Sequence, residues 1–63
     1  MIYAMVKIDK KSKQRQLMWH VNSEEHNLKE EAIAALEYSD DEVIIDGDDV
    51  TGKKFHISYE LCG

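Results

Sequence analysis

Near the end of the chain, apolar and polar residues alternate without a break, and this alternation is the strongest constraint on the fold. The alternating stretch runs from Lys54 to Leu61. Its apolar members, all on one side, are Phe55, Ile57, Tyr59 and Leu61. A two-residue period is typical of a half-buried β-strand, because successive side chains of a strand point to opposite faces. We therefore expect a sheet with one covered face, and another element that covers it.

The length of the chain allows one small domain. It has 63 residues, of which 43% are hydrophobic and 33% are charged, a composition typical of a globular protein rather than a disordered one. A chain this short buries roughly 60% of the surface that its unfolded form exposes, which leaves little room for a deep cleft. We therefore expect a single domain over residues 1–63 that is not an enzyme and needs no cofactor.

Two more strands are predicted in the first third of the chain. Residues 1–8 and residues 15–22 both alternate in polarity, and the polar, basic stretch 9–14 lies between them. Strands joined by a short polar turn usually pair as an antiparallel hairpin. In the second strand, the apolar side carries Leu17, Trp19 and Val21, and the opposite side carries Gln16, Met18 and His20.

A helix is predicted after this hairpin. Apolar residues recur at helical spacing from Leu28 onward, which favours about three turns ending near Tyr38. Two capping boxes compete for its start, because both Asn22 with Glu25 and Asn27 with Glu30 have the required spacing. The periodicity favours a helix that begins at Leu28.

The last part of the chain predicts a second hairpin. Residues 42–46 form an apolar strand, and two turns are possible after it. The stretch 46–49 is compatible with a turn or a bulge, but Thr51-Gly52 directly precedes the final strand and is favoured. The predicted fold class is therefore α+β: a small ββαββ domain with a four-stranded antiparallel sheet and one helix packed on one face.

This fold divides the apolar residues between two faces of the sheet. The predicted core comprises Ile2, Ala4, Val6, Leu17, Trp19, Val21, Leu28, Ala32, Leu36, Val43, Ile45, Phe55, Ile57 and Tyr59. One helix covers only one face, so the other face is expected to carry Tyr3, Met5, Met18, His20, Ile44 and His56, beside Ser58 and Glu60. Contiguous apolar patches often mark protein contacts, so this second face is a candidate surface for a partner or a second subunit.

Charge is unevenly distributed along the chain. Residues 1–22 have a net charge of +4, residues 23–49 of −10, and residues 50–63 of +1. Carboxylates on a helix and its flanking loops can approximate the phosphate spacing of nucleic acid. The residues expected to form this partner-binding acidic surface are Glu24, Glu25, Glu30, Glu31, Glu37, Asp40, Asp41, Asp48 and Asp49.

The favoured hypothesis is a small acidic module that binds a basic or nucleic-acid-binding protein, as a regulator or an inhibitor that mimics DNA. One alternative is a homo-oligomer that pairs through the sheet face. Another is a nucleic-acid binder that uses the basic hairpin residues Lys7, Lys10, Lys11, Lys13 and Arg15. Direct nucleic-acid binding is disfavoured because the basic stretch contains no aromatic residue and the acidic half repels phosphate.

No motif in the chain predicts catalysis or metal binding. His20, His56, Glu60 and Cys62 share the predicted outer face of the sheet, but their spacing matches no metal site. A nucleophilic pair of Cys62 with His56 has no recognisable oxyanion hole, so neither catalytic nor metal residues are predicted. The chain has one cysteine and no apolar run long enough to span a membrane, so we expect a cytoplasmic protein without membrane contacts.

Overall fold

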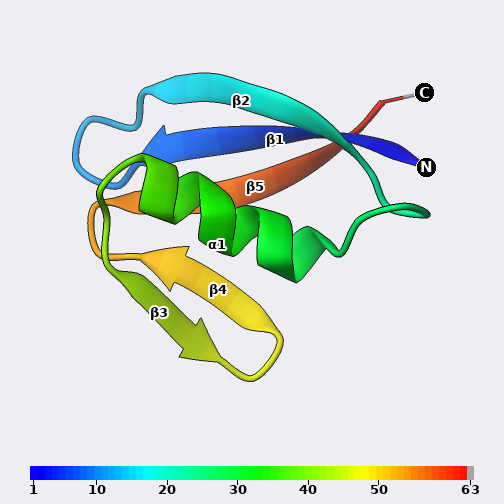
Figure 1. Ribbon diagram of the computed structural model, residues 1–63. Helices are drawn as coiled ribbons and strands as arrows, with labels where there is room; N and C mark the ends of the chain where they lie inside the picture. The colour runs from blue at the N-terminus through cyan, green and yellow to red at the C-terminus, as the bar shows by residue number, and fades with distance from the viewer. Residues whose placement is uncertain (63) are drawn as a thin grey trace.

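The computed structural model describes residues 1–62, and over this range the elements follow the order ββαβββ (Figure 1). They are β1 (Ile2–Asp9), β2 (Arg15–Asn22), α1 (Leu28–Tyr38), β3 (Val43–Asp46), β4 (Asp49–Gly52) and β5 (Phe55–Cys62). The α+β class is confirmed. The predicted first hairpin and the predicted final strand are present within one residue of their expected bounds.

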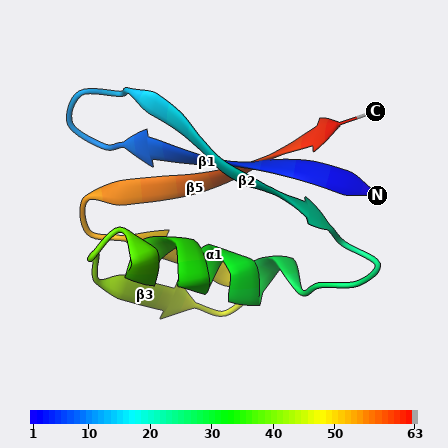
Figure 2. The ribbon, with the colours of Figure 1, turned by 45° about the horizontal axis from the view of Figure 1, so that its top comes forward.

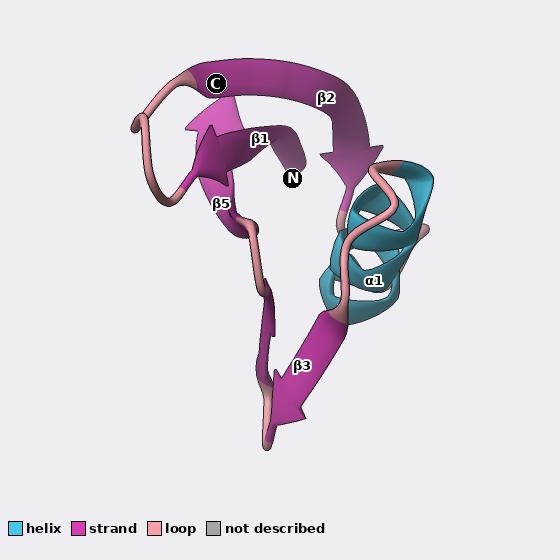
Figure 3. Cartoon of the chain, turned by 90° about the vertical axis from the view of Figure 1, so that its left-hand side faces the viewer, coloured by secondary structure: helices cyan, strands magenta, loops and turns pink. Residues whose placement is uncertain are grey.

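The strands form two sheets rather than the predicted single four-stranded sheet. Strand β1 is the centre of a three-stranded antiparallel sheet in the order β2-β1-β5, and β3 pairs only with β4. In Figure 2, α1 lies between the three-stranded sheet and β3. Figure 3 shows that the three-stranded sheet, the β3–β4 hairpin and α1 surround one interior. The predicted four-stranded sheet is therefore wrong.

The difference arises from the position of a turn. The β3–β4 connection is the two-residue loop Gly47–Asp48, in which Gly47 has a φ of 62°. Glycine with positive φ at the first central position is the pattern of a type II′ turn, whose twist suits a hairpin. The favoured turn at Thr51-Gly52 is therefore wrong, because both residues belong to β4.

The helix begins where its periodicity indicates. The side chain of Asn27 accepts a hydrogen bond from the backbone amide of Glu30 at 3.2 Å and caps the first turn. The competing residue, Asn22, instead accepts from the amide of Glu24 at 3.0 Å within the preceding loop. Both asparagines satisfy backbone donors, but only Asn27 directly precedes the apolar stripe that packs on the sheet.

The core is formed by residues from the sheet, the helix and the hairpin. Its buried members are Met5, Val21, Ala32, Ala35, Leu36 and Ile57, with Met18, Trp19, Leu28, Val43, Val50 and Phe55 packed against them. Several predicted core residues lie outside it: Ile2, Leu17 and Ile45 are exposed, and Ala4 is only half-buried. Tyr59 lies on the core side of the sheet, opposite Met5, but is 37% exposed. Sequence patterning identified the helix side of the core but not the side contributed by β1.

The two faces of β1 are reversed relative to the prediction. Met5 is fully buried and pairs with Trp19 and Tyr59, so the odd-numbered residues of β1 face the helix. Tyr3 and Met5 therefore do not lie on the outer face, and that part of the prediction is wrong. Both faces of β1 are apolar, so its alternation did not distinguish them.

A bulge in β2 adds to this reversal. Between Met5 and Val6 the β1–β2 register shifts, so that Trp19 pairs with Met5, Leu17 pairs with Val6, and Met18 is the extra residue. A bulge places one additional residue in a strand and reverses the alternation beyond it. Leu17 is consequently on the opposite side of the sheet from Trp19, and Met18 packs against the core.

We call the uncovered side of the three-stranded sheet the open face. Its residues are Ile2, Ala4, Val6 and Ile8 of β1, Arg15, Leu17, His20 and Asn22 of β2, and His56, Ser58, Glu60 and Cys62 of β5. An ion pair between Arg15 and Glu60 crosses this face diagonally, because Arg15 lies opposite Ile8 and Glu60 opposite Ala4. Val6 lies between these two positions on β1, and this outward-facing valine is only 6% exposed.

Candidate functional site

The carboxylates of three chain segments gather at one end of the molecule, which we call the acidic end. They belong to Glu24, Glu25, Glu30, Glu31, Asp46, Asp48 and Asp49. Figure 1 shows the loop before α1, the first turn of α1 and the β3–β4 turn at the same end. The Lys29 ammonium donates to the Gly47 carbonyl at 2.9 Å and connects the helix to that turn.

Most of these carboxylates are exposed and unengaged. Glu24 lies 4.0 Å from the amino terminus, and Glu31 lies 3.8 Å from His26. The remaining five accept no side-chain hydrogen bond and form no ion pair within the described part of the chain. Glu30 and Glu31 also occupy the first turn of α1, where the helix dipole favours negative charge. The acidic end therefore presents its charge to solvent.

Three members of the predicted acidic surface lie elsewhere. They lie at the opposite end of the helix from Glu30: Glu37 is in the last turn of α1, and Asp40 and Asp41 come after the helix. Of these, Asp41 has a structural task. Its carboxylate accepts hydrogen bonds from the backbone amides of Glu42 at 2.8 Å, Lys54 at 3.0 Å and Phe55 at 3.0 Å.

These contacts determine the protonation of Asp41. Burial raises the pKa of the carboxyl, but the amides of Phe55, Lys54, Glu42 and Lys53 outweigh it and hold the pKa below its ordinary value. Hydrogen bonds to the charged form have this effect because protonation would weaken them. Asp41 is therefore ionised near neutral pH, and its charge is directed at the β4–β5 connection rather than at solvent.

Gly52 makes this arrangement possible. A Cβ atom at Gly52 would overlap the Asp41 carboxylate and would lie 2.7 Å from Cδ2 of Leu36. The residue is buried and has no positive φ, so the requirement is for space rather than for backbone freedom. Glycine at this position lets the Asp41 side chain reach the amides beyond β4.

The opposite end of the molecule collects lysines from two turns, and we call it the basic end. Its members are Lys10, Lys11 and Lys13 of the β1–β2 turn and Lys53 and Lys54 of the β4–β5 connection, all exposed. The amide of Lys10 donates to the carbonyl of Lys54 at 3.0 Å, and the Lys10 ammonium donates to the carbonyl of Gly52 at 2.6 Å. These bonds hold together two segments that are more than 40 residues apart.

The β1–β2 turn is itself ordered by an aspartate. Oδ1 of Asp9 accepts from the amides of Lys11 at 2.8 Å and Ser12 at 2.9 Å. The amides of Ser12 and then Lys11 are the main reasons that the Asp9 pKa is lowered. Lys13 has a φ of 67°, and its amide donates to the Asp9 carbonyl at 2.8 Å, which closes the turn.

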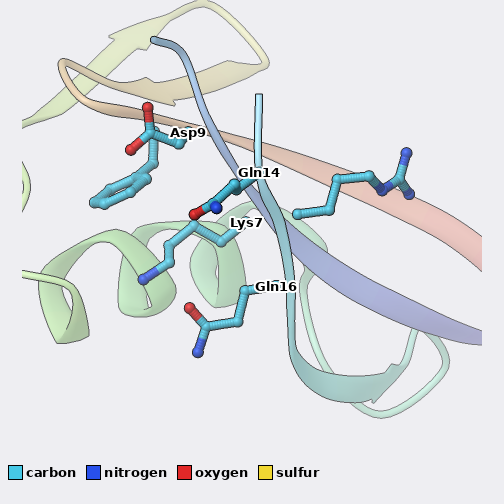
Figure 4. A pocket seen from close by; sticks show the side chains of 6 residues that line it. Lys7, Asp9, Gln14 and Gln16 are labelled. Atoms are coloured by element: carbon cyan, nitrogen blue, oxygen red, sulfur yellow. The ribbon is translucent and has the colours of Figure 1, made fainter. Parts of the chain in front are cut away.

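Two hollows adjoin the basic end. One of about 350 Å³ is lined by Asp9, Lys10, Lys11, Lys53, Lys54 and Phe55. The other, about 530 Å³, is lined by Lys7, Asp9, Gln14, Arg15, Gln16 and Phe55, and Figure 4 shows Lys7, Gln14 and Gln16 around it. Phe55 is common to both, and the Lys7 ammonium lies 4.4 Å from the centre of its ring. Sequence reasoning missed this aromatic because it follows the first basic stretch by 40 residues.

The lysines of the basic end lack acidic partners. In residues 1–62 the ion pairs are those of the amino terminus with Glu24 and Arg15 with Glu60, and His26 contacts Glu31 in a pair that is ionic only when the histidine is protonated. No lysine participates in any of them. Asp9 and Asp41, the aspartates whose carboxylates contact these two turns, accept hydrogen bonds from backbone amides instead. The ammonium groups of Lys11, Lys13, Lys53 and Lys54 are therefore available to an external anion, whereas that of Lys10 also donates to the Gly52 carbonyl.

The residues considered for metal or nucleophilic chemistry are dispersed. His56 and Cys62 belong to the same strand, six residues apart, a separation of roughly 20 Å. His20 lies opposite Ala4 and His56 opposite Ile8, on the two strands that flank β1, so four residues along the strands and two strand spacings separate the histidines by roughly 16 Å. Within residues 1–62 no group of three or more histidine, cysteine or acidic side chains is placed to hold a metal ion.

The predicted outer-face surface is not assembled as a unit. His20 and His56 lie on the open face, beside Ser58 and Glu60 as predicted. Tyr3, Met5 and Met18 are on or packed toward the core side, and Ile44 belongs to the separate β3–β4 hairpin. The outward apolar residues are instead Ile2 and Leu17, at 40% and 55% exposure.

Comparison of the chain with models of protein families, with curated proteins and with solved structures found no match. Among the described residues, no helix is both long enough and apolar enough to cross a bilayer.

Proposed function

We propose that this chain is a non-enzymatic, cytoplasmic binding module whose acidic end binds the basic surface of a protein partner. The supporting observation is the collection of seven carboxylates from the pre-helix loop, the helix start and the β3–β4 turn onto one end. Five of them have no internal partner in the described chain. A basic nucleic-acid-binding protein is the favoured partner. The acidic end would bind the phosphate-binding surface of that partner and would therefore compete with nucleic acid.

Electrostatic attraction sets the expected behaviour of such a complex. Complementary charged surfaces raise the association rate, and salt screens the attraction. Binding is therefore expected to be fast and to weaken strongly between about 50 mM and 300 mM salt, since the Debye length falls over this range. Duplex DNA is expected to compete for the same partner, because the partner would use its phosphate-binding surface to bind the acidic end.

Matched charge reversals at the two ends of α1 test the proposal. The first variant carries Glu25→Lys and Asp48→Lys at the acidic end, and the control carries Glu37→Lys and Glu42→Lys at the other end. All four side chains are exposed, and both variants change the net charge by the same amount. Proteins retained from a lysate by the immobilised chain are identified, and a purified retained protein is then titrated with each variant and with duplex DNA.

The acidic end is supported as the binding surface if three results are obtained. The first variant binds the purified partner at least tenfold more weakly, the control binds it within twofold of the unchanged chain, and duplex DNA competes with the unchanged chain. Equal weakening by both variants would show that only net charge matters. Retention that survives both reversals would exclude a charge-based surface at either position.

A second candidate function is homo-oligomerisation through the open face. It is favoured by the exposure of Leu17 and Ile2 beside the apolar centre of β1. A second copy of the chain is the occupant considered, because a two-fold pairing would bring the two apolar centres together. Light scattering at high concentration tests it: a dimer that Leu17→Lys converts to a monomer supports the candidate, and a monomer throughout rejects it.

A further inference from the structure

We propose that the basic end is a second binding surface, and that it contacts the sugar-phosphate backbone of a nucleic acid without reading its sequence. The surface consists of Lys10, Lys11, Lys13, Lys53 and Lys54 around the hollow that Phe55 lines. This inference is independent of the acidic end and does not require the protein partner proposed above.

The first argument is the arrangement of charge. The fold brings seven of the eight basic side chains of the chain to the β1–β2 and β4–β5 turns or the strands next to them, and leaves only Lys29 at the acidic end. Lys53 and Lys54 reach the first turn only because β5 pairs with β1 and the Lys10 amide bonds to Lys54. Counterion release from several lysines is the main source of sequence-independent nucleic-acid affinity.

The second argument is preorganisation. Asp9 fixes the amides of Lys11 and Ser12, and Asp41 fixes those of Lys54 and Phe55. The backbone that carries the lysines is therefore ordered before a ligand arrives, which reduces the entropy lost on binding. Both carboxylates are directed at turn amides, so within residues 1–62 neither forms an ion pair with a lysine of this surface.

The third argument is separation from the acidic end. The amino terminus of β1 lies beside Glu24, whereas Lys10 directly follows the last residue of β1. An eight-residue strand is roughly 25 Å long, about three Debye lengths at physiological ionic strength. Repulsion between the acidic end and a nucleic acid held at the basic end is therefore largely screened. The carboxylates that lie nearer the basic end are those of Asp9 and Asp41, which accept from turn amides, and those of Asp40 and Glu42, which flank Asp41.

The shape of the surface favours nucleic acid over an anionic membrane. The lysines lie on two turns with a hollow of about 350 Å³ between them. This shape suits the curved surface of a nucleic acid better than the flat surface of a membrane. The tip of the β1–β2 turn, residues 10–14, contains no apolar side chain that would insert into a bilayer. Phe55 supplies an aromatic, but Lys7 covers part of its ring, so base stacking is expected to be minor.

Fluorescence anisotropy of a labelled 15-base-pair duplex of arbitrary sequence, titrated with the full chain, tests the inference. We expect weak binding, with a Kd on the order of 10 to 100 µM at low salt, and a slope of log K against log salt of about −4. A second duplex of different sequence should bind within twofold. A single strand of equal length should show a shallower salt slope, because its charge density is lower.

The decisive variant carries Lys11→Gln, Lys53→Gln and Lys54→Gln, and its matched control carries Glu25→Gln, Glu30→Gln and Asp48→Asn. The lysine variant should bind at least tenfold more weakly, with a salt slope reduced by about three. The control should bind within twofold of the unchanged chain. Circular dichroism establishes that both are folded, and amide NMR shifts of the unchanged chain should move at Lys11, Lys54 and Phe55 but not at Glu25.

Several outcomes would overturn the inference. One is the absence of duplex binding at low salt. Another is duplex binding that the lysine variant retains, or that the acidic control strengthens as much as the lysine variant weakens it. Tighter binding to phosphatidylglycerol vesicles than to the duplex, at equal phosphate concentration, would assign the surface to membranes instead.

Discussion

The acidic end of this molecule displays carboxylates and the basic end displays lysines, and the two ends are also held together differently. At the basic end, Asp9, Asp41 and the Lys10 amide form a network of bonds to backbone groups of two turns. At the acidic end, one hydrogen bond in residues 1–62, from Lys29 to Gly47, connects the helix and the β3–β4 turn. The aspartates beside the exposed lysines therefore stabilise the backbone of the turns. The exposed carboxylates at the acidic end have few such structural roles.

This contrast predicts that substitutions at the basic end reduce stability more than substitutions at the acidic end. The network at the basic end includes Gly52, which has no room for a side chain, and the Asp41 carboxylate, which accepts hydrogen bonds from backbone amides. Substitution of either residue should therefore destabilise the fold. A domain of this size has only about 3–5 kcal/mol from its core, so the difference should be measurable for single substitutions.

The largest effect is expected for Gly52→Ala. The added methyl group would collide with the Asp41 carboxylate and with Leu36, at a cost of about 3 kcal/mol in the free energy of unfolding. Gly47→Ala is the matched control at the acidic end. It has open space but a φ of 62°, so its cost is expected to be about 1 kcal/mol. Urea denaturation compares them, and equal costs would contradict the contrast.

The next effect is expected for Asp41→Ala. Loss of the carboxylate leaves the amides of Lys54 and Phe55 without their acceptor and should cost about 2 kcal/mol. Asp40→Asn is the control, because the Asp40 carboxylate makes no such bonds and asparagine tolerates its φ of 56°. The control should change the urea midpoint little, and a comparable loss there would assign the effect to charge alone.

Asp41 also predicts a pH dependence. Its pKa in the folded chain lies below the ordinary value of 3.8, so the unfolded chain binds the proton more readily. Its contribution to stability is therefore fully present above pH 3.8 and is lost as the pH falls through the lowered pKa. Asp41→Asn should flatten the acid side of a stability profile measured by urea denaturation. An unchanged slope below pH 4 would contradict this assignment.

A smaller effect is expected for Tyr59→Phe, near the start of α1. The Tyr59 hydroxyl donates to the Leu28 carbonyl at 3.1 Å, and its loss should cost about 1 kcal/mol. Burial raises the pKa of Tyr59, so its contribution is present below pH 10.0 and is lost as the pH rises through the raised pKa. Spectroscopic titration of the phenols measures this, with Tyr38→Phe as the control because Tyr38 is 80% exposed.

The smallest effect is expected for Lys29→Met. This change removes the contact to Gly47 while keeping the aliphatic stem, and it should cost about 0.5 kcal/mol, because exposed polar contacts contribute little. Lys10→Met removes the corresponding contact to Gly52 at the basic end. Urea midpoints should show a greater loss for Lys10→Met, and the reverse order would break the contrast between the ends.

Local patterns were sufficient for much of the fold. The hairpin of β1 and β2, the helix from Leu28 to Tyr38, and β5 each have a strong period and suitable turn or cap residues. β4 was missed because four residues, Asp49–Gly52, are too few for a clear alternation and end in a glycine that resembles a turn. The orientation of β1 was missed because both its faces are apolar and the Met18 bulge was not visible in the sequence.

The candidate surfaces divide in the same way. The acidic character of residues 24–31 and 46–49 was evident from composition, but their meeting at one end depends on the position of the β3–β4 turn beside α1. The addition of Lys53, Lys54 and Phe55 to the basic turn had no local signal. It follows from the β1–β5 pairing, which the separate strands do not specify.

The sequence by itself determined the α+β class, the cap and length of the helix, and the division of charge along the chain, because each depends on residues close together in sequence. Only the tertiary structure decided which face of β1 is covered, that Asp41 serves the β4–β5 connection, and that the lysines of two distant turns form one surface. These features depend on strand order and on the space that Gly52 leaves. Contacts between residues remote in sequence, rather than local preferences, determine the free energy of folding for such features.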